Sequence, residues 1–453
     1  MGALNPSMLP KGTRDILPLE KKRRVYLQNT LAELFACFGY QPIETPALEL
    51  FKTLSGKYGE EGERLMFKLL PRGAKFEQLS GLSASEIGQH IEEALRYDLT
   101  VPFARFVVDH RSELTLPFKR YQMQPVWRAD RPQKGRYREF TQCDADVAGP
   151  GGMVQEAELI QLYDQAFERF ALPVEIRINH RSLLQGLAAQ AGCPDRFVDF
   201  AVGLDKLDKV GWEGVRADWA QRQLSIDWAR IAWMSEGESD WDSALERYKS
   251  HLSKEALAQP GLSDLHELDA LLRAVPPRHA QLRLDPSLAR GLDYYTGCIF
   301  EVSALGVELG SIGGGGRYDN LTGLFGLPGI GGVGISFGLE RIALAMEQLD
   351  VFPASISAAP PLLMAHFGGE AGLRAFALTS EWRRSGKAVE FYPKEDKLRK
   401  QMEYADKAGI GCLGLLGADE IQNNTVSIKN LKTGVQKIFG QTETEAIFDF
   451  VSA

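Results

Sequence analysis

Residues 128–138 concentrate positive charge in one short segment of the chain. They contain five basic side chains and one acid: Arg128, Arg131, Lys134, Arg136, Arg138 and Asp130. Guanidinium groups bind phosphoryl oxygens bidentately and keep their charge at neutral pH. The segment therefore predicts a loop that contacts phosphates. On composition alone, a solvated hairpin tip is the alternative.

Two more arginines stand beside glycines: Arg290 precedes GLDYY, and Arg341 follows FGLE at the start of a predicted helix. Each alone would be interpreted as a surface or ion-pair residue. The glycine run GSIGGGGRYDN lacks the Gly-Lys-Ser/Thr of a P-loop and lies in no βαβ unit. Such glycines let strands approach closely or leave room for a flat ring, and a crowded sheet is the alternative.

Acids and hydroxyls lie on strand-like segments with apolar neighbours, in RYDLT, TQCDAD and LDYYT. Asp144 and Asp146 are two residues apart, so they share one face of a strand with Gln142. Inward-facing carboxylates are costly unless a cation or a donor meets them. The pattern predicts a pocket for a ligand with an ammonium or N–H groups. Buried acids paired with nearby arginines are the alternative.

The elements that position these residues follow from periodicity. Leucines and phenylalanines at helical spacing predict a helix over 17–39, ended by Gly39, and YQPIETPALEL reads as a short extended segment at a sheet edge. We interpret 95–147 as strands alternating with turns, LRYDLTVPFARF included. Period-two patterning around Tyr121 and Met123, before the basic turn, predicts an antiparallel hairpin. A helix over 153–170 and a strand over 174–179 follow.

The remaining chain changes character twice. Residues 181–275 carry five of the seven tryptophans and no strand pattern, which predicts a helical insertion whose tryptophans pack its own core. Strand-and-glycine patterns return from 281, and a linker rich in small residues and proline covers 350–360. Beyond it, the apolar segments PLLMAHF, KAVEFYP, GCLGLLG and NTVSIKNL alternate with helices. That alternation predicts a separate α/β domain.

Composition limits the class of protein. The chain has 453 residues, enough for two or three domains, and its charge of 52 − 60 = −8 argues against coating nucleic acid through bulk charge. Five scattered cysteines with no CxxC pair indicate neither a disulfide framework nor a zinc ribbon. The sequence shows no leader and no apolar run of membrane-spanning length. We therefore expect a cytoplasmic protein with no membrane partner.

These motifs together resemble the class II aminoacyl-tRNA synthetases and, within them, the histidyl-tRNA synthetases. The resemblance covers nearly the full length. KGTRD at 11–15 is similar to the family's N-terminal peptide, and FGYQPIETPALE to motif 1, the dimer-forming element. Motif 2 is matched by WRADRPQKGRYREFTQCDADVAG, and motif 3 by GVGISFGLERI at 332–342. Two signatures peculiar to the histidine enzymes are matched by RGLDYYTG at 290–297 and GGGGRYDNL at 313–321.

The resemblance implies an α+β fold, with a class II antiparallel sheet core flanked by helices. The catalytic core would comprise 1–180 and 276–350, interrupted by the helical insertion at 181–275. Residues 361–453, with KNL at 429–431 and a charged helix around 397–407, would be the α/β anticodon-binding domain. The insertion would grip the acceptor end of tRNA.

The implied activity is ATP-dependent ligation of L-histidine to tRNA-His through histidyl-adenylate. Arg128 and Arg290 would be catalytic, on either side of the α-phosphate of ATP, with Arg136 at the outer phosphates and Arg341 at the γ-phosphate. Mg²⁺ is expected with ATP as the substrate complex, without metal ligands from the protein or a tightly bound cofactor. Arg131 and Gln133 would contact tRNA, and the protein would be a homodimer.

The resemblance also assigns the histidine pocket. Asp98, Leu99, Thr100 and Gln142 would hold the α-ammonium side of the substrate. The imidazole would lie among four further side chains: Asp146, Tyr295, Tyr294 and Tyr318. Asp98 and Asp146 stand where other members carry glutamate, so the shorter side chains would shift the ligand slightly.

Two other functions stay open at this point. One is a catalytically silent, synthetase-like regulator of histidine biosynthesis, although such paralogues commonly lose RGLDYYTG or the last domain, and this chain has both. The other is a ligase that charges a carrier protein, against which the anticodon-like residues 361–453 argue.

Overall fold

The computed structural model describes residues 8–133, 135–149, 151–235, 240–291, 295–320, 322–356 and 359–452. The chain divides into two compact units. Unit 1 holds Arg23–Phe352 together with residues 8–16, and unit 2 holds residues 17–22 and 353–452. No helix in the described part of the chain is long and apolar enough to cross a membrane.

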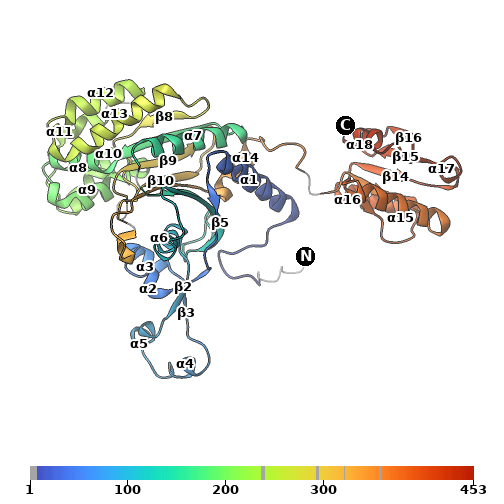
Figure 1. Cartoon of the computed structure of the whole chain (residues 1–453), viewed down its shortest axis with the longest axis horizontal. Helices are drawn as coiled ribbons and strands as arrows, with labels where there is room; N and C mark the ends of the chain where they lie inside the picture. The colour runs from blue at the N-terminus through green and yellow to red at the C-terminus, as the bar shows by residue number, and fades with distance from the viewer. Residues whose placement is uncertain are drawn as a thin grey trace. The chain divides into compact units, whose positions relative to one another are not determined.

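Unit 1 is built on an eight-stranded sheet (Figure 1). Its strands, in spatial order, are β1 (Gln41–Pro42), β5 (Phe118–Trp127), β6 (Glu139–Ala148), β11 (Gly332–Phe337), β10 (Gly313–Arg317), β9 (Cys298–Ala304), β7 (Val174–His180) and β8 (Gln281–Leu284). From β5 to β7 every neighbouring pair is antiparallel. Each edge strand is parallel to its one neighbour, β1 to β5 and β8 to β7. The predicted antiparallel sheet and the hairpin β5–β6 are confirmed.

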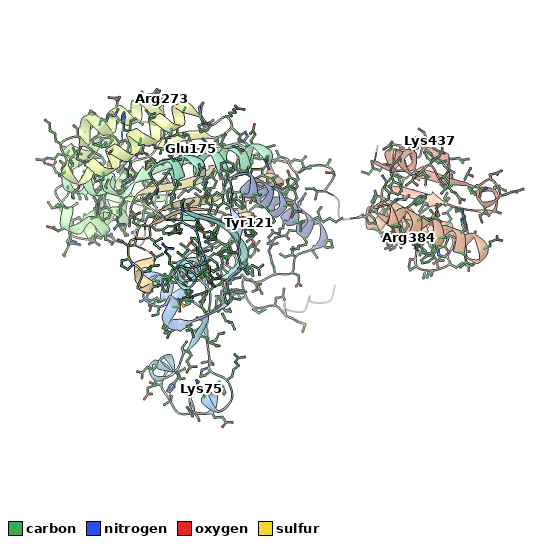
Figure 2. All side chains as sticks on the ribbon, viewed as in Figure 1. Lys75, Tyr121, Glu175, Arg273, Arg384 and Lys437 are labelled. Atoms are coloured by element: carbon green, nitrogen blue, oxygen red, sulfur yellow. The ribbon has the colours of Figure 1, made fainter. Side chains whose placement is uncertain are left out.

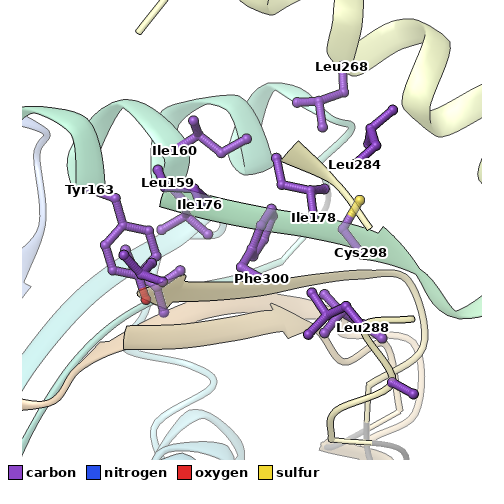
Figure 3. Packing of buried hydrophobic residues seen from close by; sticks show 14 of the residues in the cluster. Leu159, Ile160, Tyr163, Ile176, Ile178, Leu268, Leu284, Leu288, Cys298 and Phe300 are labelled. Atoms are coloured by element: carbon purple, nitrogen blue, oxygen red, sulfur yellow. The ribbon is translucent and has the colours of Figure 1, made fainter. Parts of the chain in front are cut away.

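Helices cover one face of this sheet: α1 (Pro18–Cys37), α7 (Val154–Arg169) and α14 (Leu339–Gln348) (Figure 1). The helical spacing of α1 buries Leu27, Leu31 and Phe35, and Phe35 stacks on Tyr121 of β5, a residue labelled in Figure 2, with 5.0 Å between ring centroids. Figure 3 shows Ile160 and Tyr163 of α7 packed over the sheet. One face of the sheet thus packs in the hydrophobic core, so polar side chains of the strands lie on the opposite face.

Between β7 and β8 the chain is helical, and we call Arg181–Ala274 the helical segment. Its main helices are α8 (Arg181–Gln190), α9 (Phe197–Leu204), α10 (Leu207–Gln221), α12 (Trp241–Leu252) and α13 (Gln259–Ala274). Trp219 stacks on Phe200 at 4.9 Å and is buried with Trp233. These residues belong to the same hydrophobic cluster as the sheet, so the segment packs directly on the core.

One local prediction is wrong. LRYDLTVPFARF is not a strand throughout: β4 ends at Leu95, and Thr100–Asp109 form helix α6. Val101, Ala104 and Val107 are buried at helical spacing, and the helix packs beneath the sheet near Phe118. The β-branched and aromatic residues of this stretch have strand propensity, but packing on the sheet decides its structure. Tyr295 likewise lies before β9 rather than on a strand.

A small sheet completes unit 1, with β2 (Leu48–Leu50), β4 (Glu93–Leu95) and β3 (Lys68–Leu69) in spatial order. Four short helices accompany it: α2 (Phe51–Leu54), α3 (Gly59–Leu65), α4 (Ala74–Glu77) and α5 (Ala84–Gln89). In Figure 1 the part with α4 and α5 projects away from the large sheet. Leu54 of α2 and Ala94 of β4 cluster with Tyr318, which connects the small sheet to the polar side of the large one.

Unit 2 is a five-stranded sheet with helices. Its strands, in spatial order, are β13 (Val389–Phe391), β12 (Leu362–Met364), β14 (Cys412–Leu415), β15 (Thr425–Asn430) and β16 (Gln436–Gly440). Its helices are α15 (Gly369–Arg384), α16 (Leu398–Ala408), α17 (Ala418–Gln422) and α18 (Thr444–Ser452). The four predicted strands are present. Strand β16 and helix α18, which follow the last of them, were not predicted.

Candidate active site

A cavity of about 450 Å³ opens in unit 1. Its walls come from the β5–β6 hairpin, from β9, β10 and β11, and from the first turn of α14. Six of the residues predicted to form the site line it: Arg128, Arg136, Gln142, Arg290, Tyr295 and Arg341. Because four of the six are arginines, we call it the arginine cavity.

Arg128 stands just past the end of β5 and is held in place by neutral groups. Its Nε donates to the Tyr97 carbonyl at 3.0 Å, and its Nη2 lies 3.4 Å from Gln142 Oε1. The guanidinium also sits 4.4 Å from the centroid of the Tyr97 ring. Neutral acceptors and ring faces orient an arginine without cancelling its charge, so Arg128 stays available to an anion.

The basic loop has an internal scaffold. Asp130, which is buried, accepts from Arg136 Nη2 at 2.8 Å through its carboxylate and from Arg138 Nε at 3.2 Å through its carbonyl. Arg136 also exchanges backbone hydrogen bonds with Gln133. Arg131 and Gln133 are exposed and do not line the arginine cavity. Among the described residues of this hairpin end, Arg136 thus lies inside the cavity, whereas Arg131 and Gln133 lie outside it.

Arg341 shows how crowded with positive charge the cavity is. It lies in the first turn of α14, and its Nη1 donates to the Ser311 carbonyl at 2.7 Å. Burial, reinforced by the charges of Arg136 and Arg290, lowers the pKa of Arg341. Positive charges held close together are stabilised by a bound anion, so the cavity favours a polyanionic ligand.

Arg290 enters the cavity from the loop before β9. Its Nε lies 2.7 Å from Glu301 Oε2 on β9 and 3.5 Å from Asp205 Oδ1 in the helical segment. Its side chain is 49% exposed, whereas that of Glu301 is 6% exposed. Arg290 is therefore attached to the sheet at one edge of its guanidinium.

A second polar group lies on the sheet face opposite α1 and α7. In the β5–β6 register, Arg120 faces Asp146, Gln122 faces Asp144 and Gln124 faces Gln142. We call these six residues the polar ladder. The prediction that Gln142, Asp144 and Asp146 share one face is consistent with this register, because alternate residues of a strand point to the same side.

Asp146 has charged and phenolic partners of its own in the ladder. Arg120 Nη2 lies 2.7 Å from its Oδ2, and the Tyr318 hydroxyl donates to its Oδ1 at 2.6 Å. Arg120 is fully buried and Asp146 nearly so. A Cβ at Gly334, the residue opposite on β11, would collide with this carboxylate, so the glycine makes room for it. Pairing of buried acids with an arginine, one of the two readings left open, is therefore present at Asp146.

Asp98, which is half-buried, and Asp144, which is buried, are carboxyls of the same region. The Tyr58 hydroxyl donates to Asp98 Oδ1 at 2.7 Å, and Gln142 Nε2 donates to Asp144 Oδ2 at 2.8 Å. Burial raises the pKa of Asp98 and Asp146, and it raises the pKa of Asp144 to about 7 despite the charge of Arg120. A bound ammonium would stabilise the ionised form of such carboxyls.

The other residues predicted for the histidine pocket lie around this group. Leu99 is buried and accepts from Arg120 Nη2 through its carbonyl at 3.2 Å, and Thr100 begins α6. Tyr295 packs in the cluster that contains Tyr318 and also lines the arginine cavity, so it joins the two groups. Asp98, Leu99, Thr100, Asp146 and Tyr318 do not line that cavity. Tyr294 lies outside the described residues.

Three residues of the site were not predicted from the sequence: Arg120, Tyr58 and Glu301. Arg120, Gln122 and Gln124 alternate along FKRYQMQPVW, so their period of two was a signal that could have revealed Arg120. Tyr58 and Glu301 had no comparable signal, because only the fold brings them to Asp98 and Arg290. Among the described residues, no group of three His, Cys, Asp or Glu side chains could hold a metal ion.

Comparison with known proteins decides the family. Residues 12–342 match the family model described as histidyl-tRNA synthetase, and residues 367–452 match the anticodon binding domain. The histidine–tRNA ligase of Phocaeicola vulgatus is 45% identical over 97% of this chain and 98% of its own length. The chain belongs to the histidyl-tRNA synthetase family. It is thus a class II aminoacyl-tRNA synthetase, as its motifs predicted.

Two more relatives support the family's fold across the whole chain. The histidine–tRNA ligase of Christiangramia forsetii is 46% identical over 96% of this chain and 97% of its own. The crystal structure of histidyl-tRNA synthetase from Nostoc sp. PCC 7120 superposes with a TM-score of 0.83 at 28% identity, covering 99% of this chain and all of that one. The predicted histidyl-tRNA synthetase fold, with its C-terminal anticodon-binding domain, is confirmed.

Proposed function

We propose that this chain attaches L-histidine to tRNA-His in two steps: ATP and histidine give histidyl-adenylate and pyrophosphate, and the histidyl group then passes to tRNA with release of AMP. The observation that carries the proposal is the convergence of four arginines on one cavity beside a set of buried carboxylates. The first group suits the phosphates of ATP and the second suits an ammonium ion.

In the activation step, we assign Arg128 and Arg290 to opposite sides of the α-phosphate. Negative charge grows on the equatorial oxygens as the histidine carboxylate attacks, and guanidinium groups already held in place stabilise it without reorganising. The contacts of Arg128 with the Tyr97 carbonyl and of Arg290 with Glu301 support this role. The attacking carboxylate is already an anion, so the protein needs no general base here.

Arg136 and Arg341 are assigned to the outer phosphates. Arg341 would meet the γ-phosphate, and Arg136, from the hairpin end, would meet the oxygens beside it. Mg²⁺ enters as part of the ATP substrate, where it chelates the β- and γ-phosphates and assists the departure of pyrophosphate. The charges of Arg136 and Arg290, which act with burial to lower the pKa of Arg341, support binding of a highly charged ligand.

The carboxylates are assigned to histidine. Asp98, Leu99, Thr100 and Gln142 would surround the α-ammonium, while Asp146, with Tyr294, Tyr295 and Tyr318, would select the imidazole. Asp146 Oδ1 accepts from Tyr318, whereas Oδ2 forms an ion pair with Arg120 and has no hydrogen-bond partner among the described residues, so the carboxylate retains acceptor capacity for the imidazole. A substrate without imidazole N–H groups would leave these polar atoms unpaired, which gives strong discrimination.

The tRNA would be bound by three parts of the chain. Arg131 and Gln133, exposed on the hairpin end, would lie near the first base pair, and the helical segment would contact the acceptor end. Unit 2 would bind the anticodon as unstacked bases, and its exposed Phe367 and Phe376 suit stacking. We further propose that the protein is a cytoplasmic homodimer with motif 1 at its interface.

The test is ATP–pyrophosphate exchange with each amino acid in turn, followed by charging of tRNA-His. We expect exchange with histidine alone and histidylation of that tRNA. Absence of exchange under conditions where the chain is folded would contradict the proposal and favour a silent regulator. Exchange with histidine but transfer to a carrier protein rather than tRNA would favour the other ligase.

A further inference from the structure

Arg290 lies close to two carboxylates that belong to different parts of unit 1. Glu301 belongs to β9 in the sheet, and its Oε2 lies 2.7 Å from Arg290 Nε. Asp205 lies just after α9, at the turn into α10, and its Oδ1 is 3.5 Å from the same nitrogen. One charged contact of the arginine assigned to the α-phosphate therefore comes from the helical segment.

The turn that carries Asp205 is itself anchored to the sheet. Asp208, in the first turn of α10, lies 2.7 Å from Arg177 Nη1 on β7. The same arginine lies 2.5 Å from Asp285, in the loop that leads to Arg290, and 3.9 Å from Glu301. Arg177 thus ties together the turn, the loop and the strand, which keeps Asp205 close to Arg290.

The geometry favours orientation rather than stability as the role of Asp205. Its side chain is 43% exposed, and an exposed ion pair contributes only about 0–1 kcal/mol to folding. For both carboxylates the nearest nitrogen of Arg290 is Nε. Contacts at that edge leave the two terminal amino groups of the guanidinium for a phosphate, which these groups bind bidentately.

We propose that Asp205 is a positioning residue for Arg290, and that through it the helical segment takes part in amino-acid activation before any tRNA is bound. The proposal rests on the proposed function, in which Arg290 stabilises charge at the α-phosphate. Glu301 lies within hydrogen-bond distance of the single Nε–H, and the Asp205 carboxylate adds a second negative charge beside that edge, so the terminal amino groups keep one direction in the arginine cavity.

The test is ATP–pyrophosphate exchange by Asp205→Ala and Asp205→Asn. We expect kcat to fall about tenfold in both, with KM for ATP within about twofold of the parent value, because orientation is lost while the positive charge remains. Asp205→Glu retains the carboxylate and should recover most of the loss. The matched control is Asp199→Asn on α9, where the partners are Arg196 at 2.7 Å and Arg222 at 3.2 Å; it should keep the parent rate.

A double variant separates positioning from other effects. If Asp205 acts through Arg290, adding Asp205→Ala to Arg290→Ala should lower kcat no further, because coupled residues are not additive. An unchanged kcat in Asp205→Ala, or a further drop in the double variant, would overturn the proposal. Histidine-dependent exchange by the parent chain is measured first. Its absence would refute the proposed function, whereas its presence means that a failed variant result refutes only the role of Asp205.

Discussion

The arginine cavity and the polar ladder lie side by side in unit 1 and handle charge in opposite ways. In the cavity, burial lowers the pKa of Arg341, and the charges of Arg136 and Arg290 lower it further. In the ladder, Arg120 lies within 2.7 Å of Asp146, with both side chains buried. The cavity keeps more arginines than carboxylates although Arg136 and Arg290 each contact one, whereas the one arginine of the ladder is buried against Asp146.

The difference teaches how one site can receive two substrates of unlike charge. A polyanion relieves the repulsion among the arginines of the cavity. An ammonium group relieves the cost of burying Asp98 and Asp144, whose pKa values are raised by burial. Because Gln142 belongs to the ladder and also lines the cavity, the two substrates would meet at its position.

The largest effect is expected from breaking the buried pair of the ladder. Arg120→Met removes the cation and leaves the Asp146 carboxylate buried without it, which should lower the free energy of unfolding by about 3–5 kcal/mol. Urea unfolding measures the loss. The double variant Arg120→Met/Asp146→Asn should be much less destabilised than the sum of the single changes. Strictly additive losses would mean that the pair is not an energetic unit.

The next largest effect is expected in the cavity, on rate rather than on stability. Arg290→Ala should slow adenylate formation by about 10²–10³-fold, or roughly 3–4 kcal/mol, by analogy with the loss of an oxyanion donor. Single-turnover activation measures this rate, and histidine binding should persist.

The control for that change is Arg273→Ala, an arginine on α13 whose partners are Asp242 and Asp269 (Figure 2). It should activate histidine at the parent rate. Near-normal activation by the Arg290 variant would remove Arg290 from the catalytic site and with it the contrast drawn above.

A smaller effect is expected for substrate recognition by the ladder. Asp146→Ala removes a charged hydrogen-bond acceptor, worth roughly 1.5–3 kcal/mol, and should raise KM for histidine by about 10–100-fold. Steady-state exchange at saturating ATP gives this constant. Asp109→Ala, which removes an exposed partner of Arg105, should leave it unchanged. An unaltered KM in the Asp146 variant would mean that the imidazole is selected elsewhere.

The smallest effect, when counted for each pH unit, is expected in the pH dependence of the free energy of unfolding. Burial raises the pKa of Asp144 from 3.8 to about 7, so the folded chain holds a proton that the unfolded chain releases between these values. Stability should therefore fall as pH rises from about 4 to about 7, by at most about 1.4 kcal/mol per pH unit. Asp144→Asn should flatten this slope in urea unfolding. Parallel curves for parent and variant would contradict the assignment.

Much of the cavity follows from sequence because its residues lie in compact motifs. The basic hairpin end is predicted from charge and period, and its arginine Arg136 is found in the cavity with Arg128. The antiparallel hairpin itself is predicted from the alternation around Tyr121. The side chains that hold these arginines could not be predicted. No sequence pattern links Glu301 to Arg290, and only the fold brings the two side chains together.

The ladder was less predictable, for two physical reasons. Cross-strand partners depend on register, so Arg120 and Asp146 become neighbours only when the hairpin pairing is fixed. Helix α6, beneath them, has a sequence with strand propensity and is helical because Val107 and its neighbours pack on the sheet. The roles assigned to Asp98 and Thr100 therefore depend on a turn and a helix start that the local sequence does not signal.

Strand β10 gives the arginine cavity a floor of peptide backbone: Gly313, Gly314 and Gly315 line it without side chains. A Cβ at Gly314 would come within 3.3 Å of the Phe300 carbonyl, and one at Gly315 would collide with the Gly334 carbonyl. Substitution of these glycines by residues with a side chain is therefore sterically disfavoured. An inhibitor designed to rest flat on this floor would contact atoms common to every amino acid, and resistance by point mutation at the contact would be hard to acquire.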